Sequence, residues 1–460
     1  MNSSKTKNMT KGSISGLIIS FALPIFLSNL FQQLYSTVDS LIVGKCLGTT
    51  AFTAVSSSGN LIYLFNSFFL GMSMGAGVVI SKYFGSGDND SVSKAIHTDF
   101  IISVICGILL TVGGAVFSPA CLKLMNTLPE VFDEAVGYFR FYSFGAIAMV
   151  LYSCCTGIMT ALGDSKRPLI YLIISSLLNV GLDLLFIAVF RWGVWSAALA
   201  TAIAQAISVI LCLIHLLEKG TIYQLQLSKM KITPSILLEI VKNGFPSAIQ
   251  NSVIGLANVI VQTSVNDFAL AEVAAFGAYN KISGFSFLPI TSFAMALTTF
   301  ISQNLGAKEY KRARKGSHFG VGAACILAAL IGVIMIIFPE FCISIFDDSP
   351  EVVAFGKIQI YIEASFFIFL AFSHALAAVC RGSGHASVPM IVMLSVWCVF
   401  RVIYIKVTMT LWHNIVLIYW AYPITWVISS VLFLLYYIFS DWEHGHSHEA
   451  EKRIFKKKKA

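Results

Sequence analysis

The chain has 460 residues, of which 57% are hydrophobic and only 12% are charged, and its formal net charge is +8. Soluble domains are roughly 25% charged, so the composition excludes a soluble globular protein and predicts a polytopic membrane protein. Apolar runs of about 20 residues cross the hydrocarbon layer as helices. These runs lack the alternation of apolar and polar residues that is typical of transmembrane β-strands.

Twelve apolar spans follow the polar opening MNSSKTKNMTKGS, which has no small-residue cleavage site, so we expect the first helix to be retained. The spans are predicted at 14–43, 51–81, 95–119, 134–160, 168–190, 194–217, 236–265, 271–302, 316–339, 352–380, 387–411 and 415–440. The fold class is therefore an all-α polytopic membrane protein. Its predicted parts are an N-terminal lobe 1–217, a linker 218–235, a C-terminal lobe 236–440 and a basic tail 441–460.

Basic residues are unevenly distributed between the two sides of these spans. The side with both termini carries 23 Lys and Arg, six of them within 452–459, whereas the other side carries only Lys45, Lys123 and Arg191. Because basic connections stay in the cytoplasm, we expect both termini there and the chain in the plasma (inner) membrane. The net charge then reflects topology and not nucleic-acid binding.

The two halves of the chain resemble each other. Pro24 and Asn29 recur as Pro246 and Asn251 at an offset of 222 residues. The stretch ISKYFG at 80–85 aligns with ISQNLG at 301–306, and LGDSKRP aligns with SGHASVP, both at an offset of 221 residues. Six spans per repeat give both halves the same orientation, which is a transporter architecture.

Polar residues within the spans gather on single helix faces. The first, fifth and sixth spans carry Gln32, Tyr35, Ser36, Asp39; Ser175, Asn179, Asp183; and Thr201, Gln205, Ser208. These groups are costly in lipid, so we expect them to face the inside of the N-terminal lobe. The Ser, Thr and Gln side chains are equally consistent with simple helix–helix hydrogen bonds. A buried acid instead resists ionisation unless a cation or donor compensates it, which favours a functional role for the two Asp residues.

The repeat separates a scaffold role from a local one. The repeat-related positions of Asp39 and Asp183 hold Val261 and Tyr404, so the second half lacks these acids. An acid needed for the fold would be expected in both halves. The acids therefore indicate a function confined to the first lobe.

Other polar residues in the spans have less defined roles. The seventh span carries Asn251, Asn258, Gln262 and Asn266, and we place Asp267 at the outer edge. We expect Glu363 to be an end-of-helix carboxylate that faces water. Arg140, Lys281 and Arg401 either pair with acids or extend to the interface.

Glycine, proline, cysteine and histidine complete the pattern. GMSMGAG at 71–77 is suited to close helix packing, and Pro24 weakens the helix around it and is a candidate hinge. The ten cysteines are expected as small core residues. The tail histidines His444, His446 and His448 favour a solvated basic tail near anionic headgroups over a metal site. No nucleophile–base pair, catalytic zinc signature or nucleotide loop is present, so we expect a non-enzyme without cofactors, driven by an ion gradient.

Four separated stretches resemble the multidrug and toxic compound extrusion (MATE) family over about residues 10–440. They are PIFLSNLFQQLYSTVDSLIVGKCLG, GMSMGAGVVISKYFGSGD, NVGLDLLFI at 179–187 and RGSGHASVP at 381–389. The resemblance implies two six-helix lobes in a V, a central cavity for organic cations, and antiport against H⁺ or Na⁺ by alternating access.

The resemblance also implies a cation site. Family members with such a site in the N-terminal lobe use residues that match Asp39, Tyr35, Asn179 and Asp183, and Thr201 matches a sixth-helix Thr. Bound Na⁺ would lie at Asp39, Asp183 and Asn179. Another branch places an acid in the tenth helix, where this chain reads AFSHAL at 371–376, so coupling through the C-terminal lobe is not expected.

The predicted function is a monomeric exporter of hydrophobic, often cationic drugs. Amides of the predicted cavity are Gln32, Gln205, Asn258 and Gln262. The first alternative is a flippase for lipid-linked oligosaccharides, which would need several basic residues for a pyrophosphate. The second, of another class, is a membrane-embedded receptor or enzyme, which the repeat and the missing catalytic residues disfavour.

Overall fold

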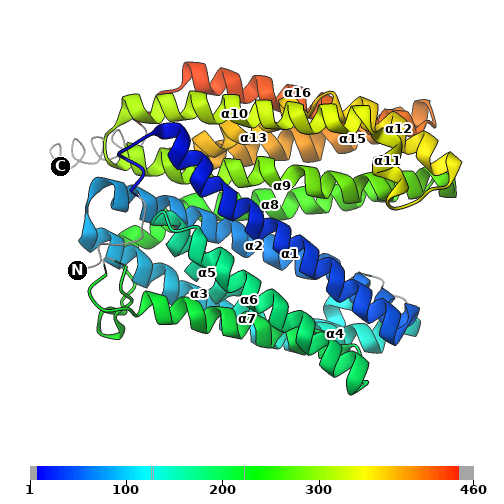
Figure 1. Cartoon of the computed structure of the whole chain (residues 1–460), viewed down its shortest axis with the longest axis horizontal. Helices are drawn as coiled ribbons and strands as arrows, with labels where there is room; N and C mark the ends of the chain where they lie inside the picture. The colour runs from blue at the N-terminus through cyan, green and yellow to red at the C-terminus, as the bar shows by residue number, and fades with distance from the viewer. Residues whose placement is uncertain (1–7, 126, 128, 222, 445–460) are drawn as a thin grey trace. The chain divides into compact units, whose positions relative to one another are not determined.

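The computed structural model describes residues 8–125, 127, 129–221 and 223–444, and this part of the chain is helical without strands (Figure 1). The first half contains α1 (Ile14–Leu47), α2 (Thr49–Ser86), α3 (Asn89–Leu124), η1 (Pro129–Val131), α4 (Phe132–Phe144), α5 (Ala146–Ala161), α6 (Lys166–Asp183), η2 (Leu184–Val189) and α7 (Trp195–Leu216). The second contains η3 (Leu227–Lys229), α8 (Pro234–Val265), α9 (Leu270–Gly306), α10 (Tyr310–Ile337), α11 (Pro339–Ser344), α12 (Pro350–Ala364), α13 (Phe367–Gly382), α14 (Ser387–Met393), η4 (Leu394–Phe400), α15 (Arg401–Leu411) and α16 (Ile415–Phe439).

Within the described residues, ten helices are long and apolar enough to cross a membrane, and two bent pairs raise the number to twelve. The bent pairs are α4 with α5, at 45°, and α12 with α13, at 49°. The first bend lies at Gly145, where a Cβ would come within 2.6 Å of the Ala202 Cβ on α7. The bend in the second repeat falls at the equivalent place, at Ser365 and Phe366. The predicted all-α fold with twelve spans is confirmed.

The chain divides into two compact units whose boundaries differ from the predicted lobes. Unit 1 contains Leu27–Gly244, and unit 2 contains Asn8–Phe26 together with the chain from Phe245 onward. Thus α1 begins in unit 2 and continues into unit 1, while α8 begins in unit 1 and continues into unit 2. The reason is packing: the first turns of each helix bury their side chains in the core of the other repeat.

The predicted linker is part of unit 1. Tyr223 and Leu225 are buried there against a core that includes Cys155 and Leu216. The Gln226 amide donates to Nε2 of His97 at 2.9 Å, and the Thr233 amide donates to the Thr98 hydroxyl at 3.1 Å. Residues 223–233 are therefore tied to the start of α3 instead of forming a free connection.

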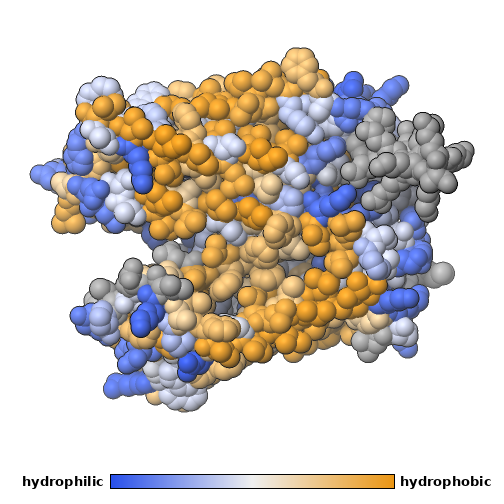
Figure 2. All heavy atoms as spheres, turned by 180° about the vertical axis from the view of Figure 1, so that it is seen from behind, coloured by the Kyte–Doolittle hydropathy of each residue, from blue (hydrophilic) through white to orange (hydrophobic). Residues whose placement is uncertain are grey.

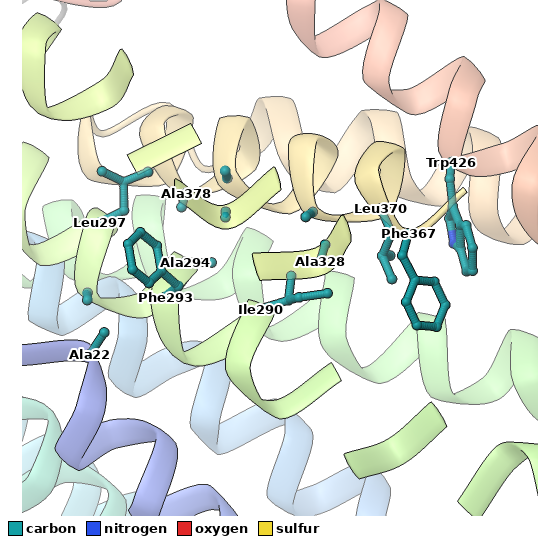
Figure 3. Packing of buried hydrophobic residues seen from close by; sticks show 14 of the residues in the cluster. Ala22, Ile290, Phe293, Ala294, Leu297, Ala328, Phe367, Leu370, Ala378 and Trp426 are labelled. Carbon is teal, nitrogen blue, oxygen red and sulfur yellow. The ribbon is translucent and has the colours of Figure 1, made fainter. Parts of the chain in front are cut away.

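The core of unit 2 is built from α9, α10, α13 and α16 with the first turns of α1. Figure 3 shows Ile290, Phe293 and Leu297 of α9 packed towards Leu370 and Ala378 of α13, with Ala22 of α1 at one end. At the other end, the Phe367 and Trp426 rings meet edge to face, with centroids 5.9 Å apart. Side chains of these helices, together with residues of α11, α12 and η4, thus form one continuous core.

Met9, near the start of the described chain, is fully buried, and its backbone anchors this segment in unit 2. Its amide donates to Oε1 of Gln303 at 3.0 Å. Its carbonyl accepts from Nδ2 of Asn304 at 3.3 Å and from Nε and Nη2 of Arg312 at 3.2 and 3.1 Å. The N-terminal end of α1 is therefore fixed to α9 and α10.

Large apolar side chains cover the outside of the helices (Figure 2). On α3, Leu109 and Val116 are 66% and 63% exposed, and on α10 Ile337 is 61% exposed. Contiguous apolar surface of this kind is unfavourable in water. It is the surface that a multi-pass protein presents to lipid.

Candidate cation site of unit 1

The structure brings Asp39 of α1 and Asp183 of α6 together inside unit 1. Their carboxyl groups lie next to each other. Asp183 is fully buried and Asp39 is half-buried. Within the described part of the chain, both carboxyl oxygens of Asp183 and Oδ1 of Asp39 have no hydrogen-bond partner apart from each other. Two adjacent buried carboxyls cannot both be charged without a compensating cation, so the site must hold a proton or bind a cation.

Helix α6 presents Asp183 and Asn179 on its face against α7. The Ser175 hydroxyl donates to the Ala204 carbonyl at 3.1 Å and fixes the register of the two helices. One turn further on, Nδ2 of Asn179 donates to the Thr201 hydroxyl at 3.3 Å, which leaves Oδ1 of Asn179 without a partner. Asp183 is the last residue before the π-helical segment η2, and such π turns are frequent at functional sites.

Tyrosines close the site from other helices. Tyr35 of α1 lies beside Gln205 of α7 and near Tyr142 of α4. Tyr138 also lies near Asp39, and its ring is 6.4 Å from that of Tyr142. The Tyr142 hydroxyl accepts from Nδ2 of Asn66 at 3.3 Å. The sequence reasoning missed Tyr138 and Tyr142; their spacing of four residues on an apolar helix was the available signal.

The side-chain atoms of this site that can coordinate a cation are all oxygens. Besides the carboxyls it includes Oδ1 of Asn179, the Thr201 hydroxyl and Oε1 of Gln205, which also lacks a partner. Hard cations prefer oxygen ligands, so these residues fit Na⁺ as well as a proton. No group of three or more His, Cys, Asp or Glu side chains suited to a metal occurs within the described residues.

The predicted cavity amides divide between the two units. Gln32 is exposed and Gln205 is partly buried in unit 1. In unit 2, Asn258 is exposed, and Nε2 of Gln262 donates to Oδ1 of Asn266 at 2.9 Å. Only Gln205 belongs to the cluster around Asp39 and Asp183, and the role of all four in substrate binding stays a prediction.

The remaining charged residues of the spans have different fates. Arg140 and Lys281 are exposed, whereas Arg401 and Glu363 are each only 2% exposed. The expectation that Glu363 faces water is therefore wrong, because α9, α15 and α16 bring side chains against it. Asp99 on α3 is a buried acid that the sequence reasoning did not single out; its Oδ2 accepts from the Cys154 thiol at 3.3 Å.

The predictions for glycine, cysteine and the tail have mixed outcomes. A Cβ on Gly75 would lie 2.1 Å from the backbone nitrogen of Gly244, so α2 and α8 touch through glycine. Five of the ten free cysteines are buried, namely Cys154, Cys155, Cys212, Cys380 and Cys398, while Cys46 is exposed. His446 and His448 lie outside the described residues.

Two comparisons of sequence identify the class of protein. The MatE family model matches residues 24–185 and again residues 246–406, so the chain belongs to the MatE family and each half is one copy of its repeat. The chain is 25% identical over 448 residues to "Probable multidrug resistance protein YoeA" of Bacillus subtilis, covering 94% of this chain and 96% of that protein. It is 23% identical to a protein named "FAD transporter" from Shewanella oneidensis, covering 74% and 76%.

Solved structures agree on the fold. An outward-facing multidrug resistance MATE family transporter of the MOP superfamily superimposes with a TM-score of 0.89 at 18% identity, covering 98% of this chain and all of that one. A MOP superfamily transporter from Pyrococcus furiosus gives a TM-score of 0.88 at 19% identity, covering 95% and 98%. The chain is a polytopic membrane protein with the fold of these transporters, and it is not of an enzyme family.

Proposed function

We propose that the protein is a secondary active exporter of hydrophobic and cationic organic compounds, driven by entry of H⁺ or Na⁺. The observation that carries the proposal is the pair of adjacent carboxyls, Asp39 and Asp183, whose buried oxygens Oδ1 of Asp39 and Oδ1 and Oδ2 of Asp183 have no protein partner apart from each other. A permanent structural pair would be expected to have donors built in. The names of several relatives, multidrug resistance or multidrug export proteins, support drugs as the substrate class.

Binding of the cation at Asp39 and Asp183 is the driving step. An ion shifts a conformational equilibrium only as far as its affinities for the two states differ. Asp39 lies on the part of α1 that belongs to unit 1, and the same helix begins in unit 2. Cation binding at Asp39 thus acts on a helix that both units share, and the change of unit along α1 falls two residues after Pro24. We assign Pro24 as the hinge of this step.

The flippase alternative is less well supported. A lipid-linked pyrophosphate calls for several accessible basic residues. Of Arg140, Lys281 and Arg401, the last is buried and already bound to Thr425. Arg140 and Lys281 lie in different units and are exposed.

We place both termini in the cytoplasm on the charge pattern, and we assign the protein as a monomer on the family resemblance.

Transport in liposomes tests the proposal. The purified protein is reconstituted, and a cationic dye, FAD and a lipid-linked pyrophosphate are supplied separately under a proton gradient or a sodium gradient alone. We expect dye movement that depends on one of the two gradients and is lost in Asp39→Asn. Movement of the pyrophosphate lipid without dye movement would replace this function by the flippase. Dye movement that ignores both gradients would exclude ion coupling.

A further inference from the structure

A second buried charged cluster lies in unit 2. Glu363 is at the end of α12, and its Oε1 accepts from Nε2 of Gln359 at 2.8 Å. The Tyr279 hydroxyl of α9 lies beside the same carboxyl. All three residues are at most 2% exposed. A buried carboxylate therefore needs compensation from within this cluster.

The compensating charge is Arg401 at the start of α15. Its Nη2 donates to the Thr425 hydroxyl at 2.8 Å, and its guanidinium lies 4.3 Å from the Tyr422 ring centroid and 5.2 Å from that of Trp397. Tyr422 also lies near Glu363, so one ring connects acid and base. The two charges attract each other without forming an ion pair within 4 Å, as far as the described residues show. A bend follows Glu363 and the π-helical segment η4 precedes Arg401.

The family repeat gives this cluster a meaning. At the offset of 221 residues, Gln359 and Glu363 take the positions of Tyr138 and Tyr142, and Tyr422 takes the position of Thr201. The two matches of the family model support this correspondence, and so do the bends of α4–α5 and α12–α13. The cluster in unit 2 therefore occupies the place that the Asp39–Asp183 site occupies in unit 1.

The two places differ in charge. The unit 1 cluster has two acids, and no basic side chain accompanies them among the described residues. The unit 2 cluster has one acid and one base. A cation from solution is required in the first and is already present in the second.

We propose that the guanidinium of Arg401 is a tethered cation, which permanently fills in unit 2 the place that a soluble cation fills in unit 1. This inference rests on the proposed function. In it, the cation position of unit 2 is always occupied by the guanidinium, so ion coupling depends on unit 1 alone. It also predicts a hidden site: an uncharged residue at position 401 turns Glu363 into an acid that must bind a proton or a cation from solution.

The groups that face Glu363 are few, which makes the prediction clear. They are Tyr279 from α9, Tyr419 and Tyr422 from α16, and Arg401 from α15. The other packed helices, α10 and α11, bring no titratable group to this carboxyl in the described structure. Without Arg401, only neutral hydroxyls and the Gln359 amide would surround Glu363.

The experiment is a charge cycle on the purified full-length protein. Melting temperatures of the wild type, Arg401→Met, Glu363→Gln and the double variant are measured from mildly acidic to mildly alkaline pH. Arg401→Met should be close to wild type at acidic pH and lose stability as pH rises, because the uncompensated carboxyl stays buried only when protonated. Glu363→Gln should be less stable at every pH, because the guanidinium cannot lose its proton. The double variant should regain most of the loss, which is roughly 5 °C or more in the single variants.

Controls distinguish this result from a packing effect. Lys281→Met removes an exposed basic residue from a span of the same unit and should show no new pH dependence. Arg401→Lys keeps the charge but loses the planar guanidinium that binds Thr425 and lies over Tyr422 and Trp397. It should lose some stability without gaining the pH dependence of Arg401→Met. Folding of the double variant where Arg401→Met alone does not fold supports the inference. An equal loss of melting temperature at every pH in Arg401→Met, or failure of the double variant to recover stability, would overturn the inference.

The cycle also separates this inference from the proposed function. Its readout is stability, so it holds or fails whether or not drugs are moved. If the stability of Arg401→Met depends on pH but the protein moves no dye, the tethered cation is supported and drug export is rejected. If the protein moves dye but the stability of Arg401→Met does not depend on pH, only the tethered cation is rejected.

Discussion

In unit 1 the buried carboxyls of Asp39 and Asp183 lie against each other, whereas in unit 2 the carboxyl of Glu363 shares its cluster with the guanidinium of Arg401. Both clusters lie at a bend of the fourth helix of their repeat. The two repeats thus share the arrangement of their helices but differ in the charges of their buried clusters. We propose from this comparison that the buried acids of unit 1 are functional because no compensating charge accompanies them in the described structure.

The comparison requires both repeats to cross the membrane in the same direction. Thiol labelling of single cysteines tests this orientation and gives the largest expected effect, because each site is either labelled or not. In a background without the native cysteines, of which Cys46 is exposed, single cysteines replace Lys45 in the last turn of α1, Asp267 after α8, and Lys311. An impermeant thiol reagent on intact cells should label the first two and not the third. Labelling at Lys311 with none at Lys45 would reverse the orientation, and opposite results at Lys45 and Asp267 would end the parallel repeat.

Asp39→Asn should have the largest effect on transport. It keeps the shape of the side chain and removes the titrating charge, so gradient-driven efflux should fall by roughly 100-fold, because the cation no longer distinguishes the two states. Expression and melting temperature should stay near wild type, since Asp39 is only half-buried. Glu363→Gln is the matched control in unit 2: per folded molecule it should retain most of its transport. Normal transport by Asp39→Asn under both gradients would move the site elsewhere.

Asp183→Asn should separate function from stability. Its carboxyl is fully buried beside Asp39, and two adjacent buried carboxyls ionise together only at a high cost. Asn at this position carries no charge, so Asp39 can ionise without a second carboxylate beside it. We expect coupled efflux to fall by roughly tenfold while the melting temperature rises by a few degrees. A fall in both would instead indicate that Asp183 is part of the scaffold.

Thr201→Ala should have the smallest effect. The hydroxyl accepts from Asn179 at 3.3 Å, and a hydrogen bond of this kind is worth about 1 kcal/mol. Cation affinity, measured from the gradient needed for half-maximal efflux, should weaken by about fivefold. Thr201→Ser keeps the hydroxyl and should be near wild type. An equal loss in both variants would point to packing of the methyl group.

Helical periodicity predicted only part of the cluster in unit 1, because Gln32 and Ser36, on the same predicted face as Asp39, are exposed. Asn179 and Asp183 are four residues apart and must lie on one face of α6, and Thr201 on α7 binds that face. Periodicity describes one helix at a time, however. It could not show that Tyr138 and Tyr142 complete the site, because their positions depend on how α4 packs against its neighbours.

The misplacement of Glu363 has a similar cause. Its position near one end of an apolar span suggested water, but the span is two helices joined by a 49° bend. Tertiary packing there encloses the carboxyl with Tyr279 and Gln359. Hydropathy also placed the lobe boundary at the most polar connection, whereas residues 223–233 pack into unit 1 and the change of unit falls within α8.

The exchange of α1 and α8 between the units has a consequence for biosynthesis. Unit 1 lacks its last helical segment until the ribosome has made residues up to Gly244, and Asn8–Phe26, although made first, belongs to a core completed only by α16. Chains usually fold domain by domain during synthesis. Here the earliest segment must wait for the latest, so neither half, expressed alone, would contain all the helix that its own core uses.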